Sequence, residues 1–209
     1  MKNFEQWETQ DIEIALDFKQ IWETHLLDDW LAAQIEFNDM ERQQIEKVRK
    51  RILHFADYWN EDELKLQAIS IILDIVDYQI ADYNIFSQRY LSSKINEIEI
   101  GGRVDFMLAK GRQKPITPYF FIHEYKQERK GTSDPKGQLL AELAVAQVCN
   151  DYKFPMYGCY VVGRNWFFMV LKDKEYAVSN AFNSSDEDIY RIIAILRKIK
   201  DYILKLKEA

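Results

Sequence analysis

The apolar positions of the first 90 residues recur every three or four residues, which is the spacing of amphipathic helices. Asn38 followed by Glu41, and Asn60 followed by Glu63, have the spacing of a capping box, so a helix is expected to begin after each asparagine. A third helical pattern, with less definite ends, lies between about residues 11 and 34. Its apolar positions are Ile14, Phe18, Ile21, Trp22 and Leu26.

The pattern changes near residue 95, where segments rich in β-branched and aromatic residues replace the helical stripe. Residues 103–108 and 119–126 predict two strands separated by a polar loop. Asp134 followed by Pro135 indicates the start of a helix that includes residues 138–148. The remaining expected elements are a hairpin of residues 157–162 and 166–171, a strand at 176–179, and a final helix that Ser185 caps and whose apolar stripe ends at Leu206.

This order of elements predicts an α/β (α+β) fold in which helices flank a mixed central β-sheet. A chain of 209 residues with 47% hydrophobic content can bury one substantial core, or one core and a helical appendage. We expect an α-helical N-terminal region over residues 1–58 and an α/β core over residues 59–209. Trp7, Trp22 and Trp59 lie in helical patterns and are expected in the core.

Composition argues against a membrane or exported protein. No stretch approaches the roughly 18 uninterrupted apolar residues that a membrane span needs. Acidic residues stand near Met1 where a signal peptide would have an apolar run, so the expected location is the cytoplasm. Cys149 and Cys159 lack neighbours at zinc-site spacing and are expected to be small core residues.

The charge is distributed unevenly along the chain. The net charge is −6, and residues 1–100 alone carry 10 Lys and Arg against 21 Asp and Glu. Residues 103–138 reverse this balance with 8 against 4, and they include the basic loop 110–114 and the pair Arg129 and Lys130. Because phosphate binding depends on the local potential, this segment could contact nucleic acid; the alternative is a solvated surface.

The second predicted strand ends with two opposite charges on one face. Glu124 and Lys126 are two residues apart, while His123 points to the other face and is expected to be a core or surface histidine. If the two strands pair antiparallel, Asp105 can approach Glu124. Two close carboxylates repel, and Mg²⁺ (or Mn²⁺) with the Tyr125 carbonyl as a further ligand would resolve this. The alternative is a cluster of cross-strand salt bridges in which Lys126 neutralises its neighbours.

These residues resemble a known motif. Gly102-Arg103-Val104-Asp105, an 18-residue gap and Glu124-Tyr125-Lys126 resemble the split signature of the restriction-endonuclease-like PD-(D/E)XK superfamily. The helix start Gln138-Leu139-Leu140-Ala141-Glu142 is similar to the Gln-containing motif of several exonuclease-like branches, and residues 60–172 resemble uncharacterised bacterial members. The chain departs from the pattern at Val104, where the superfamily often has Pro, and at Glu142, where a Tyr often follows the Gln.

The resemblance implies a restriction-endonuclease-like fold. It also implies a Mg²⁺-dependent nuclease that hydrolyses nucleic acid, with DNA as the expected substrate, in bacterial DNA processing or defence. Asp105 and Glu124 would bind the metal with the Tyr125 carbonyl, and Lys126 would orient the attacking water. Gln138 and Glu142 would contact the phosphate backbone or extend the metal shell. Glu63 would supply the acidic residue often found on the first core helix, although its position also suits the capping box.

Two other functions remain open. One is a catalytically inactive PD-(D/E)XK-fold module that binds nucleic acid or protein, and the other is an interaction protein whose acidic helical half docks a partner. The presence of Asp105, Glu124 and Lys126 together favours the nuclease. The sequence does not decide between DNA and RNA, or between a monomer and a homodimer.

Overall fold

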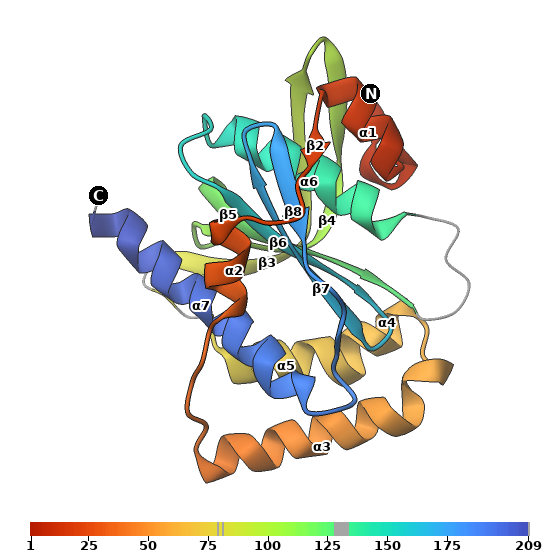
Figure 1. The fold of residues 1–209 in the computed structure, drawn as a ribbon, viewed down its shortest axis with the longest axis vertical. Helices are drawn as coiled ribbons and strands as arrows, with labels where there is room; N and C mark the ends of the chain where they lie inside the picture. Colours follow the sequence, from red (N-terminus) through yellow and green to blue (C-terminus); the bar gives the residue numbers. More distant parts are fainter. Residues whose placement is uncertain (79, 81, 128–133, 209) are drawn as a thin grey trace.

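A computed structural model describes residues 1–78, 80, 82–127 and 134–208 of the chain. In this part of the protein nine strands form one mixed β-sheet, with helices against both faces (Figure 1). The predicted mixed α/β fold with a helical N-terminal region is confirmed. No helix within the described ranges is long and apolar enough to cross a membrane.

Four long strands form the middle of the sheet: β4 (Ile98–Lys110), β5 (Ile116–Lys126), β6 (Met156–Val162) and β7 (Asn165–Lys172). β4 and β5 pair antiparallel, which is the condition for Asp105 to approach Glu124, and β6 and β7 form the predicted antiparallel hairpin. β5 and β6 are parallel, and the crossover between them contains helix α6 (Pro135–Cys149). The shorter or outer strands are β1 (Lys2–Asn3), β2 (Lys19–Gln20), β3 (Tyr83–Ile95), β8 (Glu175–Val178) and β9 (Phe182–Asn183).

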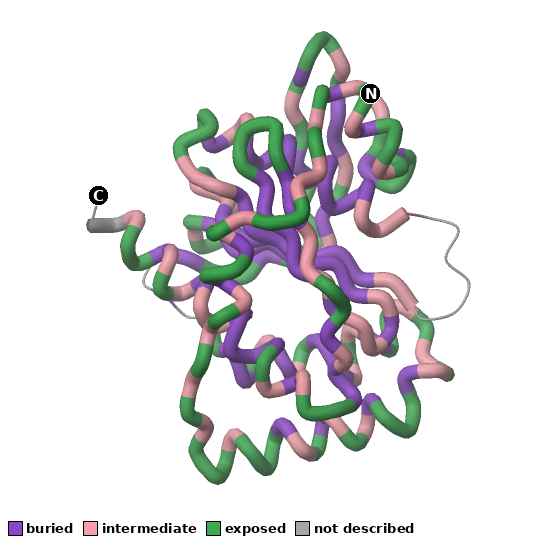
Figure 2. Tube along the Cα trace, in the orientation of Figure 1, coloured by how far each residue is buried: buried purple, intermediate pink, exposed green. Residues whose placement is uncertain are grey.

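Each face of the sheet buries its own hydrophobic cluster, visible as the buried centre of Figure 2. Helices α1 (Thr9–Leu16) and α6 cover one face, with the short helix η1 (Phe4–Gln6). The other face is covered by α2 (His25–Leu31), α3 (Asp39–Phe55), α5 (Ser70–Val76) and α7 (Asp188–Glu208). At the centre of this second cluster, Trp30 packs edge-on against the rings of Phe121, Tyr157 and Phe168.

The N-terminal region differs in part from the sequence prediction. Helices begin after Asn38 and Asn60 as expected, each with a complete capping box. The pattern between residues 11 and 34 divides into α1, β2 and α2. Residues 83–90, predicted as helical, belong to β3, which forms a long hairpin with β4. Trp22 is 85% exposed, against expectation, because it lies in the connection between β2 and α2 and not on a helix.

Two smaller expectations have mixed outcomes. Trp7 and Cys159 are buried and Trp59 packs partly buried against the core, as predicted, while Cys149 is half-buried. The last helix begins at Asp188, three residues later than the predicted cap, because the backbone and side chain of Ser185 bond to Asn183 instead.

The N-terminal segment packs closely against α6. The Thr9 backbone and hydroxyl both donate to Asp134 Oδ2, while Asp134 Oδ1 caps α6 by accepting from the N–H groups of Lys136 and Gly137. At Gly137 an added Cβ would lie 2.5 Å from the Thr9 nitrogen, so only glycine allows this approach. One aspartate therefore fixes both the start of α6 and the path of the N-terminal segment across it.

Candidate functional site

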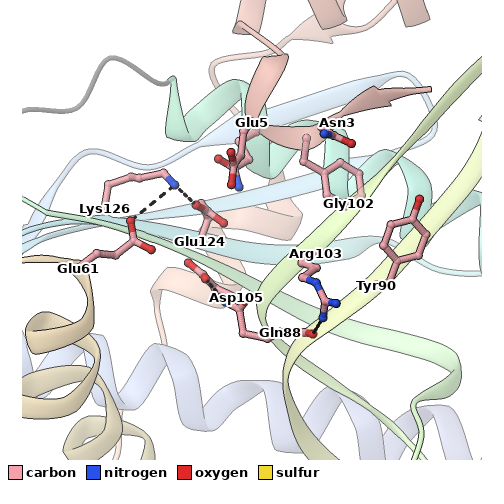
Figure 3. Close-up of a pocket in the computed structure, with 12 residues that line it drawn as sticks. Asn3, Glu5, Glu61, Gln88, Tyr90, Gly102, Arg103, Asp105, Glu124 and Lys126 are labelled. Atoms are coloured by element: carbon pink, nitrogen blue, oxygen red, sulfur yellow. Dashed lines mark hydrogen bonds and ion pairs between the residues drawn. The ribbon is translucent and has the colours of Figure 1, made fainter.

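A gap between strands forms the candidate site. β3 pairs with one edge of β4 from Ile98 to Lys110, apart from Asp105, so β1 and β5 must share the other edge. β5 pairs there as far as Phe106, and β1 pairs at Ile100 and Gly101. The stretch 102–105 lies between them and faces a cavity of about 470 Å³ (Figure 3). The residues that line it are Asn3, Phe4, Glu5, Glu61, Gln88, Tyr90, Gly102, Arg103, Asp105, Glu124, Lys126 and Gln138.

Asp105 stands where β4 and β5 separate. The pairing of the two strands ends with Phe106 opposite His123, and the next rung would place Asp105 opposite Glu124. Instead of a backbone carbonyl, Asp105 Oδ2 accepts the Tyr125 N–H at 3.1 Å. The strands thus open at the rung that carries the two carboxylates, and both line the same cavity, as the sequence predicts.

The other edge of β4 is also interrupted at Asp105. Ser87 pairs with Phe106 and Arg89 with Val104, but Gln88, which falls opposite Asp105, is left out of the ladder. Its φ of 53° is left-handed, and its Nε2 donates to Asp105 Oδ1 at 2.6 Å. This interruption leaves the register of the two strands unchanged and gives Asp105 a side-chain partner where regular pairing would offer only backbone.

Glu124 and Lys126 project from one face of β5 and form an ion pair of 2.7 Å (Figure 3). Burial, followed by the nearby charge of Asp105, raises the pKa of Glu124 to about 8 against the opposing influence of Lys126. Burial acts to lower the pKa of Lys126, but the attraction of Glu124 outweighs it and the pKa is raised. Lys126 is therefore protonated at neutral pH and suited to orienting an anion or a water, not to acting as a base.

Gln138 and Glu142 extend the site from α6. Both are buried on the same helical face, and Gln138 Nε2 donates to Glu142 Oε1 at 3.3 Å. Burial, together with the charge of Glu124, raises the pKa of Glu142 well above its usual value. Among these side chains, three buried acceptor atoms have no hydrogen-bond partner within the described part of the chain: Glu124 Oε2, Gln138 Oε1 and Glu142 Oε2.

These acceptors test whether the residues fit a metal ion. Carboxylate, amide and carbonyl oxygens are the ligands that Mg²⁺ prefers, and an ion that keeps several waters needs few protein ligands. The described residues contain no group of three or more His, Cys, Asp and Glu side chains placed to hold an ion. An ion here would therefore rely on Asp105, Glu124, the Tyr125 carbonyl and water, which is the set that the sequence predicts.

The structure places Glu61, and not Glu63, at the cavity. Glu63 is exposed, and its carboxylate accepts the Asn60 N–H at 2.8 Å in the capping box of α4 (Glu61–Leu64). Glu61 lines the cavity, 3.8 Å from Lys126 Nζ. The capping pattern explains the position of Glu63, and it gives no signal for Glu61, two residues earlier.

Lys65 is a further site residue that the sequence prediction missed. It begins a π-helical turn, η3 (Lys65–Ile69), between α4 and α5, and such turns are frequent at functional sites. Its Nζ lies 2.7 Å from Asp105 Oδ1 and 2.7 Å from Glu61 Oε1. The four-residue spacing of Glu61 and Lys65 is the signal that could have indicated this pair.

Other predicted residues lie away from the cavity. His123 is buried in the opposite cluster, where burial lowers its pKa well below the usual value and its Nδ1 lies 3.1 Å from Cys159 Sγ, so it is a core histidine as expected. Lys110, Arg112 and Lys114 are exposed and do not line the cavity. Arg129 and Lys130 lie outside the described residues.

No model of a known protein family matches the chain, and a search of curated proteins finds no match either. Interpretation of the site therefore depends on its geometry and on the motif that Asp105, Glu124 and Lys126 form.

Proposed function

We propose that this protein is a metal-dependent nuclease with a restriction-endonuclease-like PD-(D/E)XK fold and site. The main supporting observation is that Asp105 and Glu124 line one cavity at the rung where β4 and β5 separate. Lys126 Nζ lies 2.7 Å from Glu124 Oε1 beside them. Burying two carboxylates side by side is costly unless a cation or a proton compensates. The unpartnered Oε2 of Glu124 supports an ion that is bound during function.

Each residue has a role that follows from its position. Asp105, Glu124 and the Tyr125 carbonyl would hold the ion, which when bound lowers the pKa of a water and offsets negative charge on the phosphate. Lys126, protonated and fixed by Glu124, would orient that water and the phosphate. The water releases a proton to solvent as its oxygen bonds to phosphorus and the bond to the leaving ester oxygen breaks, and the leaving oxygen takes a proton from solvent. The products are a phosphomonoester and an alcohol.

A second candidate is a catalytically inactive module of the same fold. The favouring observation is that Asp105 already receives three hydrogen bonds, from Lys65, Gln88 and the Tyr125 N–H. Such a network is also what a structural salt-bridge cluster would contain. Ion binding and cleavage, measured separately, distinguish the two candidates.

The direct test is cleavage of labelled single- and double-stranded DNA and RNA by the purified chain with Mg²⁺ or Mn²⁺. We expect Asp105→Asn and Lys126→Met to reduce cleavage at least 100-fold while the far-UV circular dichroism spectrum stays unchanged. Matched controls are Asp151→Asn and Lys153→Met, because this exposed ion pair does not line the cavity. Equal cleavage by all four variants would refute the proposed site, and nucleic-acid binding without cleavage by the wild type would favour the inactive module.

A further inference from the structure

The carboxylate of Asp105 is already in contact with a cation. Lys65 Nζ and Gln88 Nε2 both donate to Oδ1, and the Tyr125 N–H donates to Oδ2. Two donors fill the lone pairs of Oδ1. A divalent ion on this carboxylate would also stand within a few ångströms of the Lys65 ammonium, and like charges at that separation repel strongly. Oδ2 keeps one lone pair for an ion, but the repulsion from the Lys65 ammonium favours displacement of that donor when the ion binds.

Lys65 is the donor best able to leave. The Tyr125 N–H belongs to the backbone of β5, and the Gln88 amide is neutral and does not repel an ion. Lys65 has a flexible four-carbon stem and a second carboxylate, Glu61, at the same 2.7 Å distance. Lys65 and Glu61 lie one helical turn apart, so the ammonium can give up Asp105 and keep Glu61 without any movement of the backbone.

We propose that Lys65 occupies the cation position on Asp105 while the site is free of metal, and that binding of a divalent ion displaces its ammonium onto Glu61. This inference rests on the proposed nuclease function and adds a regulatory property to its site. Lys65 is an internal competitor that lowers metal affinity. Glu61 has the opposite effect, because it holds the displaced ammonium.

The test measures ion affinity without nucleic acid. Isothermal titration with Mn²⁺ compares the wild type with Lys65→Met, which keeps the length of the stem and removes the charge. We expect Lys65→Met to bind Mn²⁺ at least 10-fold more tightly, while the control Lys153→Met leaves the affinity unchanged. If Lys65→Met does not fold, Lys65→Gln replaces it, and Mn²⁺ should raise the Tm of the variant more than that of the wild type.

A double-mutant cycle tests the role of Glu61. Glu61→Gln alone should weaken Mn²⁺ binding, and this effect should largely disappear in the Lys65→Met background, because Glu61 acts through the ammonium. Unchanged or weaker binding by Lys65→Met would overturn the inference, as would an undiminished effect of Glu61→Gln in the double variant. Cleavage by the wild type tests the nuclease proposal separately: a gain in affinity without any cleavage supports the competitor and refutes the nuclease.

Discussion

Gln88 stands opposite Asp105 in the register of β3 and β4, yet it contacts Asp105 through its side chain alone. Its φ of 53° removes it from the ladder. Its side-chain amide donates to Asp105 Oδ1, and its backbone carbonyl accepts from Arg103 Nη1. A non-glycine residue in this region costs about 1–2 kcal/mol. Backbone strain of this kind tends to gather at functional sites, where the surrounding structure holds it in place.

The strained backbone predicts an unusual order of stability at position 88. In an ordinary strand, a protein with glycine at a given position is less stable than one with alanine there by about 0.5–1 kcal/mol. At Gln88 we expect the reverse, with Gln88→Gly more stable than Gln88→Ala by about 1 kcal/mol, because only glycine adopts the positive φ without cost. Both variants lose the same hydrogen bond to Asp105. The difference between their free energies of unfolding in urea therefore gives the cost of the backbone conformation alone.

The neighbouring Ser87 is the matched control, since it is exposed and paired regularly with Phe106. There Ser87→Ala should be more stable than Ser87→Gly. The same order at both positions would show that Gln88 carries no strain.

The buried Glu124 predicts a stability that falls with pH. Its pKa is about 8 in the folded protein and near the ordinary 4.5 when unfolded, so between these values the unfolded chain releases a proton that the folded protein keeps. Unfolding is therefore favoured as pH rises from about 4.5 to 8. With chelator present to remove divalent ions, Glu124→Gln should reduce the stability loss between pH 5 and pH 8 by on the order of 2 kcal/mol.

Part of the slope should remain in that variant, because the pKa of Glu142 is raised in the same direction. The exposed Glu97→Gln should leave the wild-type slope intact. A steeper slope in Glu124→Gln than in the wild type would mean that Glu124 is ionised at low pH and stabilised by Lys126.

The predictable part of the site lies on β4 and β5. Alternation along a strand places Glu124 and Lys126 on one face, and antiparallel pairing brings Asp105 to them, so sequence reasoning finds all three. Glu61, Lys65 and Gln88 could not be found in this way. Their contacts with Asp105 and Lys126 depend on how a helix and the interrupted strand β3 pack beside β4, which no local pattern specifies.

The interruption at Gln88 explains why the pattern of β3 predicts a helix. The buried residues of this strand are Tyr83, Phe86, Leu91 and Ile95, at spacings of three to five. Phe86 and Leu91 lie five residues apart yet belong to the same hydrophobic cluster, because the left-handed Gln88 between them interrupts the alternation of the strand without inserting a residue. The apolar spacing alone therefore favours a helix over this stretch.

Contacts made by Trp30 predict that the N-terminal region unfolds together with the sheet. The ring of this α2 residue is fully buried among Phe121, Tyr157 and Phe168, and its Nε1 donates to the Ile195 carbonyl at 2.7 Å. Trp30→Phe should cost about 1–2 kcal/mol for the lost hydrogen bond and volume. Fluorescence and circular dichroism should report one coincident transition, whereas a separate early transition would make residues 1–58 an independent unit.

The last prediction separates two glutamates two residues apart on α4. Glu61 lines the cavity and contacts Lys65 and Lys126, while Glu63 closes the capping box with Asn60. If the protein is a nuclease, Glu61→Gln should lower cleavage at least 10-fold with little change in stability. Glu63→Gln should leave cleavage and stability nearly unchanged, because a Gln amide oxygen accepts the N-cap N–H of a capping box as Glu does. Loss of cleavage in a fully folded Glu63→Gln variant, with normal activity in Glu61→Gln, would reverse these roles and would require a different orientation of α4 when substrate is bound.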